Sequence, residues 1–430
     1  MIPDLAASDI ACGQQFPIAV VGAFLTLVLR CAASLRGAAK ILDVFGPLAG
    51  CDTTPHWSTG RLWLLRVGLA ALWLPKVMAD DWVWMIDHSI QIGTTKCLMI
   101  LGIRLCELPV GRPLSHEDME PIALEPMKSS NKDAVAACLK ATVARTGVPR
   151  VIVDDHGADL HGGVEIFRRD YSEVCEVYDV KHKAACLLKS RLEGDARWKE
   201  FASLLGQTKF QIQQTELAFL VPPSQRSKAR FMNIDVLVEW ARAALTVVDN
   251  PSLLSPLGVE ASRVSAKIGW LADFRAEVAD WSGCQALIGA TLDFVRRQGL
   301  YRGAGVDLAA QLPAVSGGAE KLREELIDFV TKQSSQARIG ERLPGTTEVL
   351  ESCFGKLKAI EDGQSKSGFT GLVLSLGAMV GKLESPMLET MLERVGVREV
   401  IMWCRQKLGI SIQSQRQRFH GIAARATELG

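Results

Sequence analysis

Two short apolar runs, each ending in acidic residues, dominate the hydrophobic pattern of the chain. Residues 82–86 are aromatic, β-branched or otherwise apolar and lead into Asp87, and residues 151–153 lead into Asp154 and Asp155. Short apolar runs of this kind are typical of buried strands. We therefore predict two strands, each of which delivers a carboxylate to the edge of a sheet.

The elements around these two strands alternate between strand-like and helix-like patterns. Further strands are predicted at residues 96–105, 108–113 and 174–178, and helices at 132–146, 160–171 and 181–205. From about residue 215 helical periodicity replaces the strand pattern, with helices predicted at 234–248, 262–278, 285–298 and 319–332. The pattern indicates a mixed β/α core interrupted by an all-helical insertion.

Five segments follow from this pattern. We predict a helical N-terminal segment at 1–80, the first part of the core at 81–206, the helical insertion at 207–340, the second part of the core at 341–382, and a helical C-terminal segment with a basic tail at 383–430.

The N-terminal segment contains two short helical stretches, at 34–42 and 58–66, with a turn-rich stretch between them. Ser58 is a suitable N-cap for the second. The pair could form a helix-turn-helix whose second helix offers Thr59, Arg61 and Arg66 to DNA. The alternative is an ordinary helical hairpin with exposed arginines.

Composition narrows the class of protein. The 49 basic and 48 acidic side chains nearly cancel, so nucleic-acid binding would depend on local basic clusters. Two such clusters are Lys181 with Lys183, and Arg226 with Lys228 and Arg230. The apolar run at 16–29 is too short to span a bilayer comfortably, so we predict a buried helix and no membrane contact.

Several common active sites have no counterpart in the sequence. The eleven cysteines are scattered without a C-x-x-C pair, which favours a reducing cytosol and argues against zinc or disulfides. The seven histidines show no zinc-ligand spacing. No phosphate-binding or dinucleotide-binding glycine pattern and no G-x-S-x-G motif is present.

The acidic residues suit a different chemistry. Two-metal phosphoryl transfer needs carboxylates that hold two divalent cations close together. Asp87 and one of the adjacent pair Asp154 and Asp155 could supply two of them. Neighbouring residues of an extended chain point in opposite directions, and the Asp-His-Gly turn favours Asp155.

A third carboxylate would come from a predicted helix at 346–358. Glu348 and Glu351 lie one turn apart on the same face of that helix. Glu351 is favoured because Lys358 follows on the same face two turns later, where it could hold a substrate phosphate. Glu348 remains the alternative.

With these motifs in hand, the chain resembles the DDE-type transposases of prokaryotic insertion sequences. The resemblance is carried by Met85-Ile86-Asp87-His88-Ser89, by Val153-Asp154-Asp155-His156-Gly157-Ala158-Asp159-Leu160, and by the E-x6-K spacing of Glu351 and Lys358. It implies an RNase H-like catalytic core. The tyrosine and arginine that precede the glutamate in that signature are replaced by Thr347 and Pro344, which leaves the subgroup open.

The resemblance also implies a site and its partners. Asp87, Asp155 and Glu351 would be catalytic metal ligands for two Mg²⁺ ions, with Mn²⁺ able to substitute, and Lys358 would contact the DNA end. The 196 positions between Asp155 and Glu351 (351 − 155) match transposases that carry an insertion before the glutamate. The expected partners are the terminal inverted repeats of a transposon, its target DNA, and further copies of the chain in a homodimer or higher oligomer.

The expected function is therefore metal-dependent strand cleavage at transposon ends, followed by transfer of the 3′-hydroxyl into target DNA. We expect a cytoplasmic, nucleoid-associated protein. The alternatives are a structure-specific nuclease of the same fold, such as a junction resolvase, and a DNA-binding derivative that has lost activity.

Overall fold

The computed structural model describes residues 10–11, 13–51, 53–92, 95–224, 231, 234–362, 371–410 and 412–428. The chain divides into two compact units. The first comprises Met1–Pro109, Pro113–Val177 and Thr347–Gly430, and the second Val110–Arg112 and Tyr178–Thr346. The second unit begins earlier than the predicted insertion at 207–340, because helix α6 (Val180–Leu192) packs against α10 (Arg275–Gln298) and α12 (Gly318–Ser334).

A five-stranded mixed sheet is the centre of the first unit. Its strands are β1 (Trp82–Ile92), β2 (Thr95–Arg104), β3 (Glu120–Met127), β4 (Val151–Asp154) and β5 (Cys175–Tyr178), in the order β3-β2-β1-β4-β5. The pairs β1/β2 and β2/β3 are antiparallel, whereas β1/β4 is parallel. This order and these directions confirm the predicted RNase H-like mixed sheet.

The third strand lies later in the chain than the sequence predicts. The predicted strand at 108–113 is wrong: a 3₁₀ turn at Leu105–Glu107 ends the run, and no strand follows until β3. The β3 strand contains Pro121 and Pro126, which usually argue against a strand because proline cannot donate a backbone hydrogen bond. Since β3 is at the edge of the sheet, both prolines are tolerated there.

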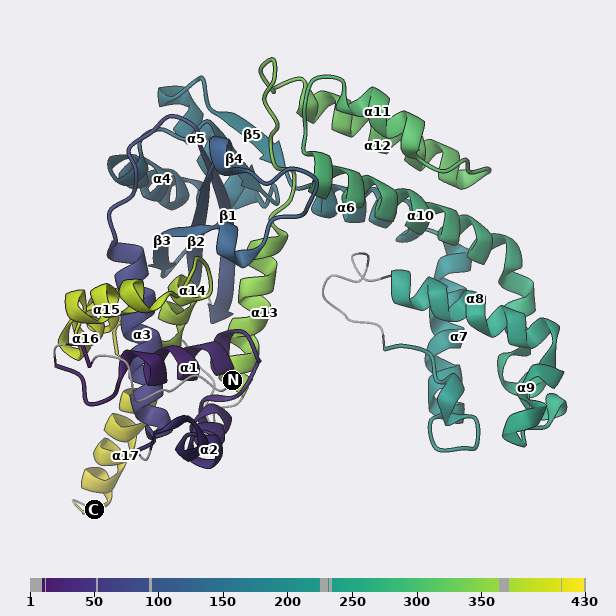
Figure 1. The fold of residues 1–430 in the computed structure, drawn as a ribbon. Coiled ribbons are helices and arrows are strands. Elements are labelled where there is room, and N and C mark those ends of the chain that lie inside the picture. The colour runs from purple at the N-terminus through teal and green to yellow at the C-terminus, as the bar shows by residue number, and fades with distance from the viewer. Residues whose placement is uncertain are drawn as a thin grey trace. The chain divides into compact units, whose positions relative to one another are not determined.

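Helices cover the sheet on both faces, as Figure 1 shows. The helix α4 (Lys132–Thr146) has the predicted bounds and is capped by Asn131, whose side chain accepts a hydrogen bond from Ala134 N. It packs with α5 (Ala158–Asp170) over the face formed by Trp82, Trp84, Ile86 and their neighbours. The helix α13 (Glu348–Asp362) contacts β1 and contributes nothing to that core cluster, so it covers the other face.

A helical layer from both ends of the chain completes the first unit. It contains α1 (Ile18–Leu29), α2 (Leu35–Phe45), α3 (Trp57–Trp73), α14 (Ser375–Ala378), α15 (Ser385–Arg394) and α16 (Val397–Lys407). The helix α3 is at its centre and contacts all the others. At α14 the backbones touch: a Cβ on Gly68 would lie 1.9 Å from the carbonyl oxygen of Leu374. The last helix, α17, spans Ile412–Glu428.

The central place of α3 is incompatible with a recognition helix. Nearly every residue from Trp63 to Leu72 is buried, and the N-cap is His56 where Ser58 was predicted. Arg66 is only 7% exposed and donates hydrogen bonds to the carbonyl oxygens of Val395 (2.7 Å) and Leu392. The predicted DNA contact by Arg66 is therefore wrong, because its guanidinium group joins α3 to the end of α15.

The described residues of the second unit form helices joined by loops and turns, with no strand pairing other than an isolated bridge between Leu300 and Leu343. Besides α6, α10 and α12, they form α7 (Ala196–Ile212), α8 (Asp235–Asp249), α9 (Ala261–Ile268) and α11 (Ala304–Gln311). The helix predicted at 181–205 is interrupted, because Asp195 caps the new helix α7 by accepting a hydrogen bond from Trp198 N. An aromatic cluster, in which Trp198, Phe201 and Trp281 stack edge to face, forms part of the core.

Candidate functional site

Strands β1 and β4 bring the first two predicted carboxylates to neighbouring positions. The register pairs Trp84 with Ile152 and Met85 with Val153. Asp87, two residues beyond Met85 in β1, points to the same sheet face as Met85, and Asp155 directly follows the last residue of β4. That face is the one covered by α13, the helix that carries Glu351.

The two adjacent aspartates have different surroundings. Asp154 is fully buried, and its Oδ1 accepts a hydrogen bond from His156 N (3.0 Å). Burial, followed by the neighbouring Glu176 carboxylate, raises the pKa of Asp154 to about 8. Asp155 is half-buried in the turn after β4, and its Oδ1 accepts a hydrogen bond from Gly157 N (2.8 Å). Asp154 therefore stabilises the turn after β4 and is shielded from solvent.

The third carboxylate reaches the sheet from a distant part of the chain. Glu351 is in the first turn of α13 and is half-buried, with its Oε1 out of contact with solvent. Glu348, one turn earlier, is also half-buried, so burial does not distinguish the two glutamates. Lys358 lies further along α13 and is exposed. The assignment of Asp87, Asp155 and Glu351 as ligands remains a prediction.

A hydrogen-bonded network surrounds His88, the residue of β1 that follows Asp87 and points to the opposite face. Asp159 Oδ2 accepts hydrogen bonds from Ser130 Oγ (2.7 Å) and Lys96 Nζ (2.9 Å), and the Ser130 hydroxyl also contacts His88 Nε2 (2.9 Å). These partners hold the pKa of Asp159 at about 2, despite partial burial. Burial lowers the pKa of His88, an effect that the carboxylates of Asp159 and Asp155 oppose. The network holds the side chain of His88, which directly follows Asp87.

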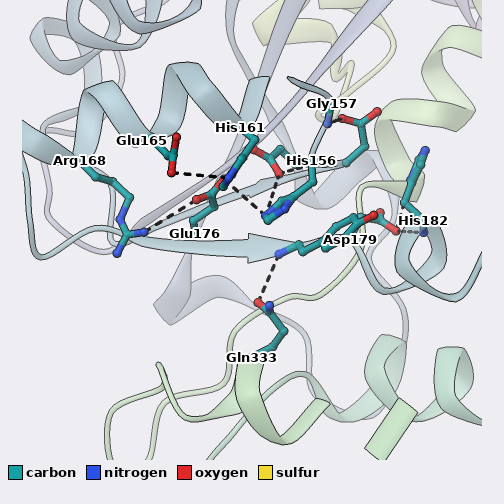
Figure 2. A network of polar contacts seen from close by, with 12 residues as sticks. His156, Gly157, His161, Glu165, Arg168, Glu176, Asp179, His182 and Gln333 are labelled. Carbon is teal, nitrogen blue, oxygen red and sulfur yellow. Dashed lines mark hydrogen bonds and ion pairs between the residues drawn. The ribbon is translucent and has the colours of Figure 1, made fainter. Parts of the chain in front are cut away.

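A second polar group, which we call the histidine–carboxylate cluster, consists of Asp154, His156, His161 and Glu176. His161 Nδ1 lies 2.6 Å from Glu176 Oε1, and His156 Nε2 lies 3.5 Å from the same oxygen. Figure 2 shows both imidazole rings turned toward Glu176 on β5. The rings stack with their centroids 4.2 Å apart.

The histidine–carboxylate cluster escaped the sequence analysis for a physical reason. Its members come from three elements: the end of β4 and its turn, α5, and β5. They come together because β4 and β5 are neighbours in the sheet and α5 connects them, so no linear spacing reveals the group. The one local signal is His156, whose φ of 56° is unusual for a residue other than glycine.

The remaining predicted DNA contacts have varied positions. Lys181 and Lys183 are half-buried on α6, and the Lys183 ammonium lies 5.8 Å from the centre of the Phe329 ring. Arg61 is half-buried on α3, and burial lowers its pKa. Arg226, Lys228 and Arg230 lie outside the described residues.

Comparisons with known proteins do not identify the function of the chain. No protein-family model and no curated protein sequence matches the chain. Among solved structures it is similar to the Drosophila P element transposase strand transfer complex, with 8% identity, a TM-score of 0.29, and coverage of 94% of this chain and 85% of that one. The score is too low to support a conclusion about function, which must be inferred from the chain's own residues. No helix among the described residues is both long and apolar enough to cross a membrane.

Proposed function

We propose that this chain is a transposase that cuts DNA at transposon ends and joins the freed 3′-hydroxyl to target DNA. One observation carries the proposal: Asp87 lies within β1 and Asp155 directly follows the adjacent parallel strand β4, and α13, which carries Glu351, packs against β1. Three carboxylates converging on one face suit a site for hard divalent cations.

The donor chemistry of the three residues fits Mg²⁺ or Mn²⁺. Carboxylate oxygens are the ligands these ions prefer, and close carboxylates repel one another unless a cation neutralises them. When bound, such ions activate the attacking oxygen and stabilise the leaving oxygen of the phosphodiester. In this role Asp87, Asp155 and Glu351 hold the ions, and the chain supplies no covalent nucleophile.

Cleavage of a labelled duplex that carries the element's own end tests the proposal. With Mg²⁺ or Mn²⁺, the wild-type chain should nick the end, and Asp155→Asn should remove the product while DNA binding in a gel-shift assay persists. Asp170→Asn is the matched control, because Asp170 is exposed and paired with Lys140 on the surface. Cleavage retained in Asp155→Asn contradicts the assignment.

The same assay distinguishes the open alternatives. Glu351→Gln and Glu348→Gln, compared side by side, identify the glutamate on which cleavage depends. A four-way junction that is cut while the duplex end remains intact would favour the resolvase. Binding of the end without any metal-dependent product would favour an inactive derivative.

A further inference from the structure

The histidine–carboxylate cluster is separate from the carboxylates of the proposed reaction. Asp154 follows Ile152 on the sheet face packed by α5, whereas Asp87 and Asp155 belong to the opposite face. One ligand-type atom from each of His156, His161 and Glu176 lies within 4.8 Å of the other two. These three side chains converge on a single point without contributing to the DNA-cleaving site.

The spacing of these atoms matches a first coordination shell. Nitrogen and oxygen ligands about 2.1 Å from a tetrahedral zinc ion are about 3.4 Å from one another. His156 Nε2 is 3.5 Å from Glu176 Oε1 and 3.8 Å from Asp154 Oδ1. The 2.6 Å contact between His161 and Glu176 is a hydrogen bond, which a small outward movement of the half-exposed His161 would open for a cation.

The two acidic side chains of the histidine–carboxylate cluster are both buried. The Asp154 side chain is 0% exposed and that of Glu176 is 6% exposed. Asp154 Oδ2 is buried, and no hydrogen-bond partner for it exists among the residues that the structure describes. Two neighbouring buried acidic side chains repel one another when both are ionised, and either a proton or a bound cation relieves that repulsion.

Ion pairs with the histidines and Arg168 can compensate the cluster's acidic charge only in part. Because the His156 and His161 rings stack 4.2 Å apart, protonating both would set two positive charges against each other. Arg168 lies 3.8 Å from the other oxygen of Glu176, Oε2. Oε1 is the oxygen that both imidazoles approach, so a cation shared by the three side chains would bind there.

We propose that His156, His161 and Glu176 bind one divalent transition-metal ion of the zinc class. Asp154, which is buried next to His156, is not one of the three ligands. Imidazole nitrogens select such ions over Mg²⁺, which prefers oxygen ligands. Since His156 directly follows Asp155, the bound ion would fix the turn that carries Asp155. This inference does not depend on the proposed DNA chemistry.

Cobalt provides a spectroscopic test on the full chain. The protein is freed of tags, stripped with a chelator and titrated with Co²⁺, whose visible absorption reports coordination by nitrogen and oxygen. The wild type should bind one equivalent tightly, Zn²⁺ should displace it, and millimolar Mg²⁺ should not. His161→Gln should weaken binding at least tenfold. His420→Gln, which removes an exposed histidine from α17, is the control and should bind as the wild type does.

Two further variants make the outcome decisive. Glu176→Gln keeps the size of the buried side chain but removes its charge, and it should also lose the Co²⁺ spectrum while retaining a wild-type circular dichroism spectrum. Asp87→Asn should retain Co²⁺ binding even where it abolishes DNA cleavage. Binding that survives in His161→Gln, binding lost in Asp87→Asn, or no tight equivalent in the wild type would each overturn the proposal.

Discussion

Replacing Arg66 with methionine is expected to destabilise the first unit by about 3 kcal/mol. Methionine keeps the apolar stem of the side chain but removes the guanidinium group, which donates to the carbonyl oxygens of Val395 and Leu392 and to Gln14 Oε1 (2.9 Å). The variant leaves two buried carbonyl oxygens without donors.

The magnitude follows from these contacts. A buried acceptor left without a donor costs about 1–3 kcal/mol, and two are affected. Burial lowers the pKa of Arg66, so its desolvation already offsets part of what the hydrogen bonds contribute. About 3 kcal/mol is the expected net loss in the free energy of unfolding.

Urea and thermal unfolding followed by far-ultraviolet circular dichroism measure this loss. Arg30→Met is the matched control, because Arg30 pairs with Glu117 at 2.7 Å on the surface, where both side chains are about half exposed. Such a pair contributes at most about 1 kcal/mol. An unchanged unfolding midpoint for Arg66→Met, combined with weaker DNA binding, would refute the structural role and restore the DNA contact.

Two further predictions concern packing and pH. Gly68→Ala should lower the free energy of unfolding by about 3 kcal/mol, and with it the thermal midpoint, because the new Cβ would overlap the carbonyl oxygen of Leu374. Gly206→Ala, in an open position on α7, is the control and should be neutral or stabilising. Equal thermal midpoints for the two variants would contradict the close approach of Gly68 to Leu374. Asp159→Asn should cost about 1 kcal/mol at pH 7, since the partners of Asp159, Lys96 among them, stabilise its ionised form in a partly open site. Because its pKa of about 2 lies below the ordinary 3.8, this stabilisation is complete above about pH 4 and is lost as the pH falls toward 2. The difference in unfolding free energy between variant and wild type should therefore narrow over that range, and a constant difference would show that the ionised form is not responsible.

Elements with strong local patterns could be predicted from the sequence. The strand before Asp154 and the helix α4 form as expected, and the strand that leads into Asp87 also forms, although β1 continues past Asp87 to Ile92. The edge strand β3 was missed because its prolines and glutamates look like loop residues until its position in the sheet is known. Local propensity cannot supply that position.

The candidate functional residues likewise divide into those that the local sequence pattern predicts and those that depend on the tertiary fold. Asp87 and Asp155 could be singled out because each follows a strand-like run, and sheet order then makes them neighbours. Arg66 was misread because its partners on α15 lie more than 300 residues away, so that a buried anchor looked like an exposed arginine. The histidine–carboxylate cluster was missed for the same reason: it depends on how β4, α5 and β5 assemble.

The division of the first unit across the chain has a consequence for the order of synthesis. Asp87 and Asp155 leave the ribosome with the first part of the sheet, but Glu351 follows 196 residues later, after the whole second unit. At about 5–20 residues per second, that delay is roughly 10–40 s. The residues that cover α3 from α15 and α16 emerge later still. A nascent chain therefore carries only two of the three proposed metal ligands, and the proposed cleavage activity would begin only when the protein is nearly complete.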